Sequence, residues 1–294
     1  MLGLSAVAGT PSLARVLTTW QPASGVLAGC VVAAVLYGFA VTRRRRRWPV
    51  HRTLAFALGL ALVVVALDSG LDVYAGQLAS IHMVQHLVLT LVAAPLLAAG
   101  APLTLALGAT RGVARARLVA VIGSAPARAV TRPVGSWLLF VGAIVIWHLT
   151  PLYDLSLRHP LLHDLEHVLL LGTAVLFWAQ VLRADPLPHP LGSLGRLLYL
   201  LAAMPAMSVI GVWLVVSHAL RYPAYALPAR ALGVSALRDQ HLAGVIMWGG
   251  DALLGVITLA IACAALLEEE RRAAAIDSYR EAGGRPIGLR RAAP

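Results

Sequence analysis

The sequence predicts an all-α membrane protein, a polytopic bundle of about seven transmembrane helices with the N-terminus outside and the C-terminus in the cytoplasm. Of its 294 residues, 59% are hydrophobic and only 13% are charged, whereas a soluble domain of this length carries about a quarter charged residues. The apolar residues gather into runs of about the 20 residues that a helix needs to cross the hydrocarbon core. Arginines flank these runs unevenly, which sets the orientation.

Seven segments have the length and composition of membrane spans. The second is the weakest, because Asp68 and Asp72 interrupt its last turns, and the fourth is short at its outer end. In chain order, the predicted spans are Ser24–Thr42, Thr53–Tyr74, Ala79–Ala99, Val134–His148, Leu161–Leu182, Leu194–Ser217 and Leu242–Leu267.

The basic residues predict the topology. All 24 are Arg, and 19 of them lie in the three loops and the tail that share one side of the membrane. The positive-inside rule makes this side cytoplasmic. The chain then divides into an extracytoplasmic segment (1–23), a seven-helix membrane domain (24–267) and a cytoplasmic Arg-rich tail (268–294). The net charge of +11 reflects this topology and attraction to anionic lipid, so we expect a lipid bilayer and no nucleic acid as partner.

The connecting segments carry further expectations. Residues 1–20 lack a basic region ahead of an unbroken apolar run, so no cleaved signal peptide is predicted. Gly108–Pro133 is expected to be a basic cytoplasmic loop, and the outer loop His218–Gln240 to hold a short surface helix. The seventh helix is expected to continue into the tail as far as Gly283–Gly284, since glycine commonly ends helices.

Eight of the ten histidines are predicted to lie at one membrane face. Odd-numbered spans begin at the outer face and even-numbered spans end there, and the histidines follow this parity. The clustering does not depend on the orientation, because all eight would move together. They are His82, His86, His148, His159, His163, His167, His218 and His241.

The spacing of four of these histidines is typical of metal ligands. "HMVQH" places His82 and His86 on one helical face, and "HPLLHDLEH" does the same for His163 and His167, because residues four apart are neighbours on a helix. Polar groups inside a bilayer face the bundle or a cavity. Two inward-facing pairs at similar depth therefore predict a metal site at the outer face.

Other side chains extend the predicted site. The metal-ligand set is expected to include His241 and Met247. Additional ligands could come from His148, His218, Asp68, Met83 and Asp251, although His148, His159 and His218 are also expected bystanders. Met204 and Met207 are predicted to be core packing. Imidazole suits Zn, Cu, Fe and Ni, and thioether ligands favour Cu(I).

Three stretches resemble the CtaG-type assembly factors of caa-type cytochrome c oxidases. They are "HMVQHLVLTLVAAPLLAAGAP", "WHLTPLYDLSLRHPLLHDLEHVLLLGTAVLFW" and "DQHLAGVIMWGGD". The resemblance covers about Trp20 to Leu267. Its motif positions are His82, His86, Pro95, His148, His163, His167, Asp239, Gln240, Gly244, Met247 and Trp248. It implies a multi-pass protein of the bacterial plasma membrane, copper as the metal, and oxidase subunits or copper chaperones as partners.

Two other classes of function stay open at this stage. "HDLEH" matches an inverted zinc-protease pattern, so the cluster could serve a membrane zinc hydrolase with Glu166 as base and Ser80 and Asp68 as helpers. Glu166 could equally form a surface pair where its helix meets the interface. Facing histidines could instead ligate haem in an electron carrier.

Overall fold

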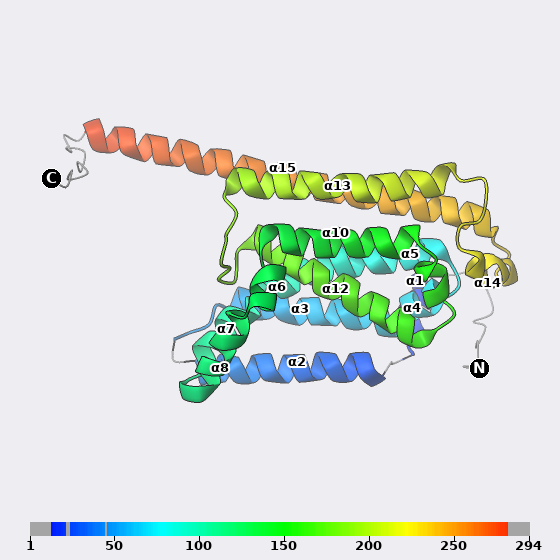
Figure 1. Cartoon of the computed structure of the whole chain (residues 1–294), viewed down its shortest axis with the longest axis horizontal. Helices are drawn as coiled ribbons and strands as arrows, with labels where there is room; N and C mark the ends of the chain where they lie inside the picture. Colours follow the sequence, from blue (N-terminus) through cyan, green and yellow to red (C-terminus); the bar gives the residue numbers. More distant parts are fainter. Residues whose placement is uncertain (1–12, 22–23, 45, 282–294) are drawn as a thin grey trace.

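The computed structural model describes residues 13–21, 24–44 and 46–281, which are almost entirely helical (Figure 1). Within this part of the chain, extended pairing is limited to one antiparallel bridge between Trp20 and Ser69. The long helices are α2 (Ser24–Arg43), α3 (Val50–Asp68), α10 (Pro133–Leu149), α12 (Pro160–Leu182), α13 (Ser193–Val216) and α15 (Ala236–Glu281). A further long helical stretch consists of α5 (Ala79–Leu87), the π-helix η1 (Val88–Ala93), α6 (Ala94–Ala99) and α7 (Pro102–Ala109).

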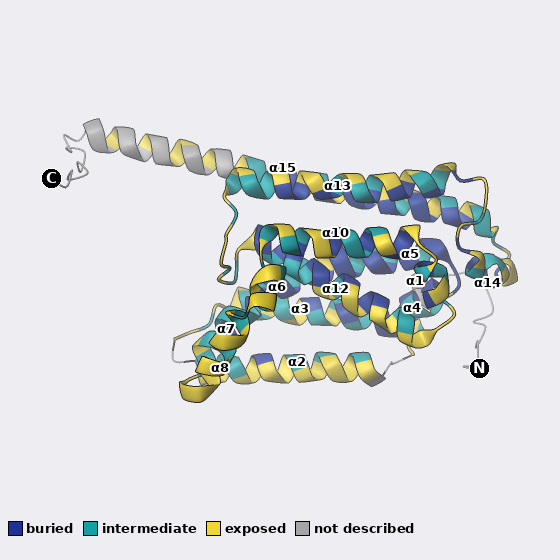
Figure 2. Ribbon diagram, viewed as in Figure 1, coloured by how far each residue is buried: buried dark blue, intermediate teal, exposed yellow. Residues whose placement is uncertain are grey.

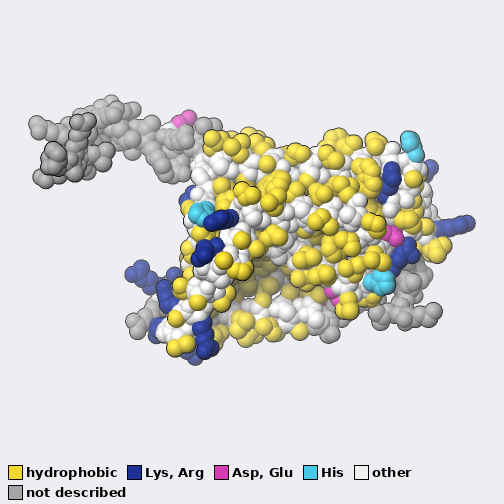
Figure 3. Space-filling model, in the orientation of Figure 1, with side chains coloured by type: hydrophobic (Ala, Val, Ile, Leu, Met, Phe, Trp, Pro, Cys, Tyr) yellow, Lys and Arg dark blue, Asp and Glu magenta, His cyan; other side chains and the backbone are white. Residues whose placement is uncertain are grey.

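Seven apolar helices confirm the predicted class of fold. Among the described residues, six stretches are long and apolar enough to cross a membrane: Gly25–Arg43, Val50–Asp68, Ala79–Ala109, Pro160–Leu182, Ser193–Val216 and Ala236–Ala264. The seventh, α10, has 17 residues, at the lower end of the spanning range of about 17–25. This is the helix that the sequence predicted to be short. Figure 3 shows the hydrophobic surface between two ends that carry the arginines.

The third span lies at the centre of the bundle. The stretch from α5 to α6 is contacted by α3, α12 and α15, and half of the span that contains it is buried inside the protein, against 6% of the first span. Figure 2 shows the contrast between the buried central helices and the exposed α2. Side chains on the central stretch therefore face protein on most sides.

The longest helix pair, α13 and α15, packs through glycine. A Cβ on Gly211 would lie 2.8 Å from the carbonyl oxygen of Gly244, and a Cβ on Gly244 would lie 2.6 Å from that of Gly211. Small residues allow such close backbone approach between membrane helices. The family-motif position Gly244 is thus explained by packing.

Two predicted segments differ from the structure. The second span ends at Asp68, because Ser69 adopts an extended backbone and its hydroxyl caps α4 (Gly70–Ala75) by accepting from the Leu71 amide at 3.1 Å. The predicted loop Gly108–Pro133 is instead largely helical, in α8 (Gly112–Ile122) and α9 (Ala125–Val130). Its Ala, Arg, Leu and Val content is compatible with helix once glycine is confined to the ends.

Other connecting segments follow the prediction. The loop after α13 contains the 3₁₀-helix η2 (Pro223–Tyr225) and α14 (Ala226–Ala231), and α15 continues the seventh span to Glu281. Short helices α1 (Leu13–Thr18) and α11 (Leu152–Ser156) complete the described chain. Most of the predicted N-terminal segment and the end of the tail lie outside the described residues.

Candidate metal centre

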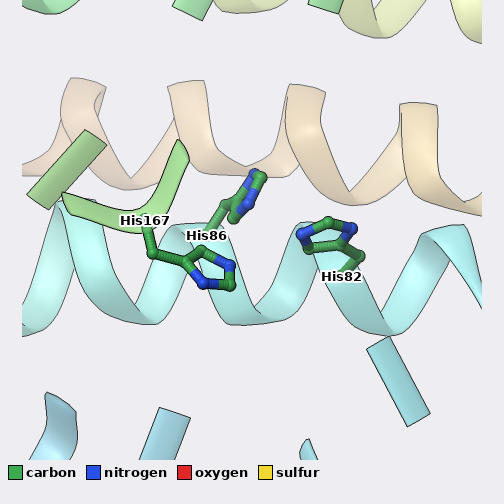
Figure 4. Close-up of side chains that lie close together, drawn as sticks. All are labelled: His82, His86 and His167. Atoms are coloured by element: carbon green, nitrogen blue, oxygen red, sulfur yellow. The ribbon is translucent and has the colours of Figure 1, made fainter. Parts of the chain in front are cut away.

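Four histidines from two helices meet at one end of the bundle, as predicted. The rings of His82 and His86, on α5, are 4.3 Å apart between centroids, and those of His163 and His167, on α12, are 4.4 Å apart. Across the helices, His86 lies 5.5 Å from His167 and His82 lies 5.1 Å from His163. One ring nitrogen each from His82, His86 and His167 lies within 4.8 Å of the others. Figure 4 shows these three rings gathered along α5.

Helix geometry explains this arrangement. Each pair is spaced by four residues, so its two rings lie on one helical face. Both helices begin at the same end of the bundle, which brings the pairs to the same level. His82, His86 and His167 are buried, with at most 6% of their surface exposed, whereas His163 is partly exposed and lies on the open side of the cluster.

Two tyrosines hold the ring of His82. Its Nδ1 lies 2.7 Å from the Tyr225 hydroxyl and 2.9 Å from the Tyr153 hydroxyl. Tyr225 donates its own proton to the carbonyl oxygen of Ala75 at 3.1 Å, so it accepts from His82 Nδ1. The Nε2 of His82 then carries the lone pair, and it faces His163 Nε2 at 3.4 Å. Such outer contacts commonly fix the tautomer of a metal-binding histidine.

Burial keeps the two phenols neutral. It raises the pKa of Tyr153 and that of Tyr225 well above the ordinary value of 10. The hydroxyls therefore act as hydrogen-bonding groups and add no charge near the histidines.

A buried carboxylate adjoins the cluster. Glu166 is fully buried, its Oε2 accepts from the Ser156 hydroxyl at 2.7 Å, and its Oε1 lies 3.7 Å from His86 Nε2. The expected surface pair for Glu166 is therefore wrong, because the turn of α12 that carries it faces the bundle. With His82 and His163, Glu166 forms a second group whose ligand atoms lie within 4.8 Å of one another.

The cluster concentrates buried polar atoms that have no hydrogen-bond partner within the described part of the chain. Leaving such an atom unpaired costs about 1–3 kcal/mol, and buried polar groups are usually satisfied. A cation would use one lone-pair nitrogen from each neutral imidazole ring and the carboxylate oxygen. The atoms without such a partner are His86 Nδ1 and Nε2, His167 Nε2, His148 Nε2 and Glu166 Oε1.

Three further predicted residues lie beside the cluster. His148, at the end of α10, is buried and its ring lies 5.8 Å from that of His86. Met83 and Met247 are buried and line a small cavity together with His86 and His148. The ring of His148 therefore turns toward the bundle, and its role as a ligand or a bystander stays a prediction.

Other predicted residues are placed elsewhere. His241 Nε2 lies 3.0 Å from the carbonyl oxygen of Ser217, and His218 is exposed. Asp251 accepts a hydrogen bond from Ser208 on α13. Asp68 is buried at the end of α3. Among the described residues, no group of three or more His, Cys, Asp or Glu ligands includes these four side chains.

The tyrosines are the functional neighbours that the sequence reasoning missed. Tyr153 lies on α11 and Tyr225 on η2, while Tyr222 donates from its hydroxyl to the carbonyl oxygen of His148 at 3.1 Å. All three lie in connecting segments at the end of the bundle where the histidines were predicted. A buried tyrosine needs a partner for its hydroxyl, and that requirement was the available signal.

Below the histidines, a π-helix changes the course of the third span. The amide of Ala94 donates to Leu89, five residues back, so the carbonyl of Thr90 loses its α-helical partner. The next residue, Pro95, has no amide hydrogen to offer. Trp178 on α12 donates its indole N–H to Thr90 O at 2.7 Å. π-helical turns of this kind are frequent at functional sites.

The fold and the cluster define a polytopic membrane protein with a buried histidine site at one end of its bundle. A sequence model of the cytochrome c oxidase caa3 assembly factor (Caa3_CtaG) family matches residues 35–269. The chain belongs to this family, which confirms the resemblance drawn from its motifs.

Its curated relatives include mycobacterial proteins. The uncharacterized proteins Mb0105 of Mycobacterium bovis and MT0111 of Mycobacterium tuberculosis are each 33% identical over 279 residues, and ML1998 of Mycobacterium leprae is 31% identical over 280. The matches cover 90% of this chain but 42% of each relative, so the chain spans about two fifths of their length. No solved structure matches the chain.

Proposed function

We propose that this protein binds copper at the histidine cluster and delivers it to a cytochrome c oxidase during assembly in the bacterial plasma membrane. The observation that carries the proposal is the meeting of His82, His86 and His167 in a buried site, where His86 and His167 have ring nitrogens without a partner among the described residues. Imidazole is a good copper ligand. Family membership supports the assembly role, and copper is the cargo that the protein would carry.

The donor set fits a copper ion. His82 offers Nε2 because the tyrosines engage its Nδ1, and His86 and His167 have unpaired nitrogens. Glu166 can balance the charge of the cation from the side of His86. Neutral imidazoles must compete with protons for the metal, so copper retention should weaken at acidic pH.

The distribution of arginine supports an outer position for the site. The histidine cluster lies at the end of the bundle where α5 and α12 begin, and 19 of the 24 arginines belong to the loops and the tail that the sequence assigns to the other side. With that arginine-rich side in the cytoplasm, copper would enter from the extracytoplasmic face. Copper chaperones outside the membrane and oxidase subunits within it are then the expected partners.

The test is the copper content of the purified full-length protein. We expect bound copper in the wild type and its loss when His86→Ala and His167→Ala are combined. The matched control combines His218→Ala and His241→Ala, two histidines at the same end but outside the cluster, and should retain copper. Equal copper in the wild type and the His86/His167 variant would rule out the site.

The assembly role needs a cellular test. A deletion strain should lose caa3-type oxidase activity, and added copper should restore part of it if supply is the step that fails. The His86/His167 variant should fail to complement, while the His218/His241 variant should complement. Normal oxidase activity in the deletion strain would refute the role.

The zinc-hydrolase alternative draws on one observation, the buried Glu166 beside His82 and His163. Against it, Ser80 is held by Asp239 through a side-chain hydrogen bond, and Asp68 belongs to no ligand group among the described residues. Preferential zinc binding, with turnover of a lipid amide that Glu166→Gln abolishes, would establish this class. For haem, the small cavity beside His86 has a volume of about 20 Å³, far too small for a macrocycle.

A further inference from the structure

A small cavity lies directly below the histidine cluster, toward the middle of the membrane span. Its lining includes Thr90, on η1 and one turn beyond His86, and Ile144, one turn before His148 on α10. The third span and α10 run in opposite directions. Thr90 and Ile144 therefore both lie farther than the histidines from the end of the bundle that holds the cluster. Its volume of about 20 Å³ is enough for one water-sized guest, which needs at least about 10–15 Å³.

Methionines from three helices converge on this cavity. Met83 comes from α5, Met207 from α13 and Met247 from α15, and each is at most 4% exposed. They are three of the five methionines in the chain, whose other members are Met1 and Met204. Met207 lies in the hydrophobic core, as predicted, and its side chain also lines the same space as two histidines.

Two of the residues that line the cavity, His86 and His148, carry imidazole nitrogens without a partner among the described residues. His86 has two and His148 has one, Nε2, without a hydrogen-bond partner in the described structure, and both residues are at least 95% buried. Methionine packing alone does not require such atoms nearby, and leaving them unpaired is costly. A guest that accepts lone pairs from both nitrogen and thioether sulfur explains the combination.

Local packing keeps the space for Met207. A Cβ on Gly250 would lie 3.0 Å from Met207 Cε and 2.7 Å from Leu87 Cδ2. Gly250 follows Met247 by three residues on α15, so the same helical face supplies both a sulfur and the room for a second one. A larger residue at this position would force the Met207 thioether to move.

We propose that this methionine chamber, formed by Met83, Met207 and Met247 with His86 and His148, is a second and deeper site that takes Cu(I). Thioether sulfur is a soft ligand that favours Cu(I) over Zn(II) or Cu(II). His86 belongs to both sites, so a monovalent ion could pass from the histidine cluster to the chamber by exchanging ligands around one ring. No electron transfer is involved, because the ion enters and leaves as Cu(I). The inference rests on the proposed copper function and adds the oxidation state and the direction of movement.

The test compares metal coordination in matched variants of the full-length protein. Buffered Cu(I) is titrated anaerobically, and the ligands are identified by X-ray absorption at the copper edge. The wild type should show both nitrogen and sulfur neighbours. Combining Met207→Leu with Met247→Leu should remove the sulfur and lower Cu(I) affinity by roughly 10- to 100-fold, while Zn(II) binding is unchanged. Met204→Leu, on the same helix but outside the chamber, is the control and should behave as wild type.

Methionine-to-leucine changes preserve volume and usually cost less than about 1.5 kcal/mol, so these variants should fold. If they do not, selenomethionine protein loaded with Cu(I) should show a selenium neighbour without any substitution. Nitrogen-only coordination in the wild type would overturn the chamber and leave the histidine site standing. No Cu(I) binding at all would overturn the chamber, and the additional absence of copper from the purified wild type would overturn the histidine site.

Discussion

Trp178→Phe removes a hydrogen bond that nothing nearby can replace. The indole donates to Thr90 O at 2.7 Å, and both residues are at most 5% exposed. In an α-helix the amide of Ala94 would satisfy this carbonyl, but it donates to Leu89 instead. In a continued π-helix the amide of residue 95 would do so, but that residue is proline.

The expected loss in the free energy of unfolding of Trp178→Phe has two parts. An unpaired buried carbonyl costs about 1–3 kcal/mol, whereas interhelical hydrogen bonds in membrane proteins average about 0.6 kcal/mol. We expect the upper range here, because Thr90 O has no alternative partner within the described helix. The smaller phenyl ring adds a packing loss of roughly 1 kcal/mol. Unfolding measured in mixed micelles should therefore show a loss of about 2–4 kcal/mol for Trp178→Phe.

A second substitution separates the two parts. Pro95→Ala restores an amide that can donate to Thr90 O, five residues back, so it can replace the indole. In a Pro95→Ala background, Trp178→Phe should cost only the packing part. The two substitutions should then be coupled by about 1–3 kcal/mol, within the range for residues that share a partner. Strictly additive losses would refute the account of the π-helix as a carbonyl left unpaired by proline.

Two other predictions follow from close contacts and from burial. Gly244→Ala should destabilise the protein by about 1–3 kcal/mol in the same unfolding assay, because the new Cβ meets the backbone of Gly211. Gly249→Ala, with open space around it, should be neutral or stabilising. Equal effects of the two substitutions would contradict the glycine packing between α13 and α15. Burial raises the pKa of Asp72 from 3.8 to about 6, despite a hydrogen bond from Gln85. Folding therefore favours the protonated form of Asp72. The stability that this preference adds is fully present below about pH 4 and is lost as the pH rises through about 6. Asp72→Asn should gain melting temperature relative to wild type between pH 4.5 and 7, and a constant difference would contradict the shifted pKa.

The sequence was sufficient to predict the class of fold and the level of the histidines. Helix parity and the i, i+4 spacing place His82, His86, His163 and His167 at one end, and the structure brings them together. Both rules depend only on helix periodicity and on the direction of each span. They need no knowledge of which helices are neighbours.

The positions of the other predicted site residues depend on which helices are neighbours. His241 begins its span at the same end, but it bonds to the backbone at Ser217, because its side of α15 faces α13 rather than α12. By contrast, the ring of His148 faces inward, because α10 packs on α12. Tyr153 and Tyr225 reach His82 from loop segments, whose paths no periodicity describes.

The chamber and the cluster share His86, so the position of α5 decides whether either site can form. Three neighbouring helices fix α5 through polar contacts at different levels. Gln85 donates to Ala66 O of α3 at 2.9 Å, Ser80 bonds to Asp239 of α15, and Trp178 of α12 holds the carbonyl of Thr90 just below. Asp239 thus acts on the histidines by holding the helix that carries them.

Gln240, the other half of the "DQ" motif, acts on the opposite wall of the site. Its Oε1 accepts from the Arg221 amide at 2.6 Å and its Nε2 donates to Ala219 O at 3.2 Å, which fixes the loop that leads into Tyr222 and Tyr225. Since Tyr225 sets the tautomer of His82, the motif positions both a histidine helix and the phenol that orients its first ring. The motif thus holds two walls of the histidine cluster, α5 through Asp239 and the loop before Tyr225 through Gln240. A site that passed an ion between two donor sets, as proposed, would need both walls fixed while only the ion moved.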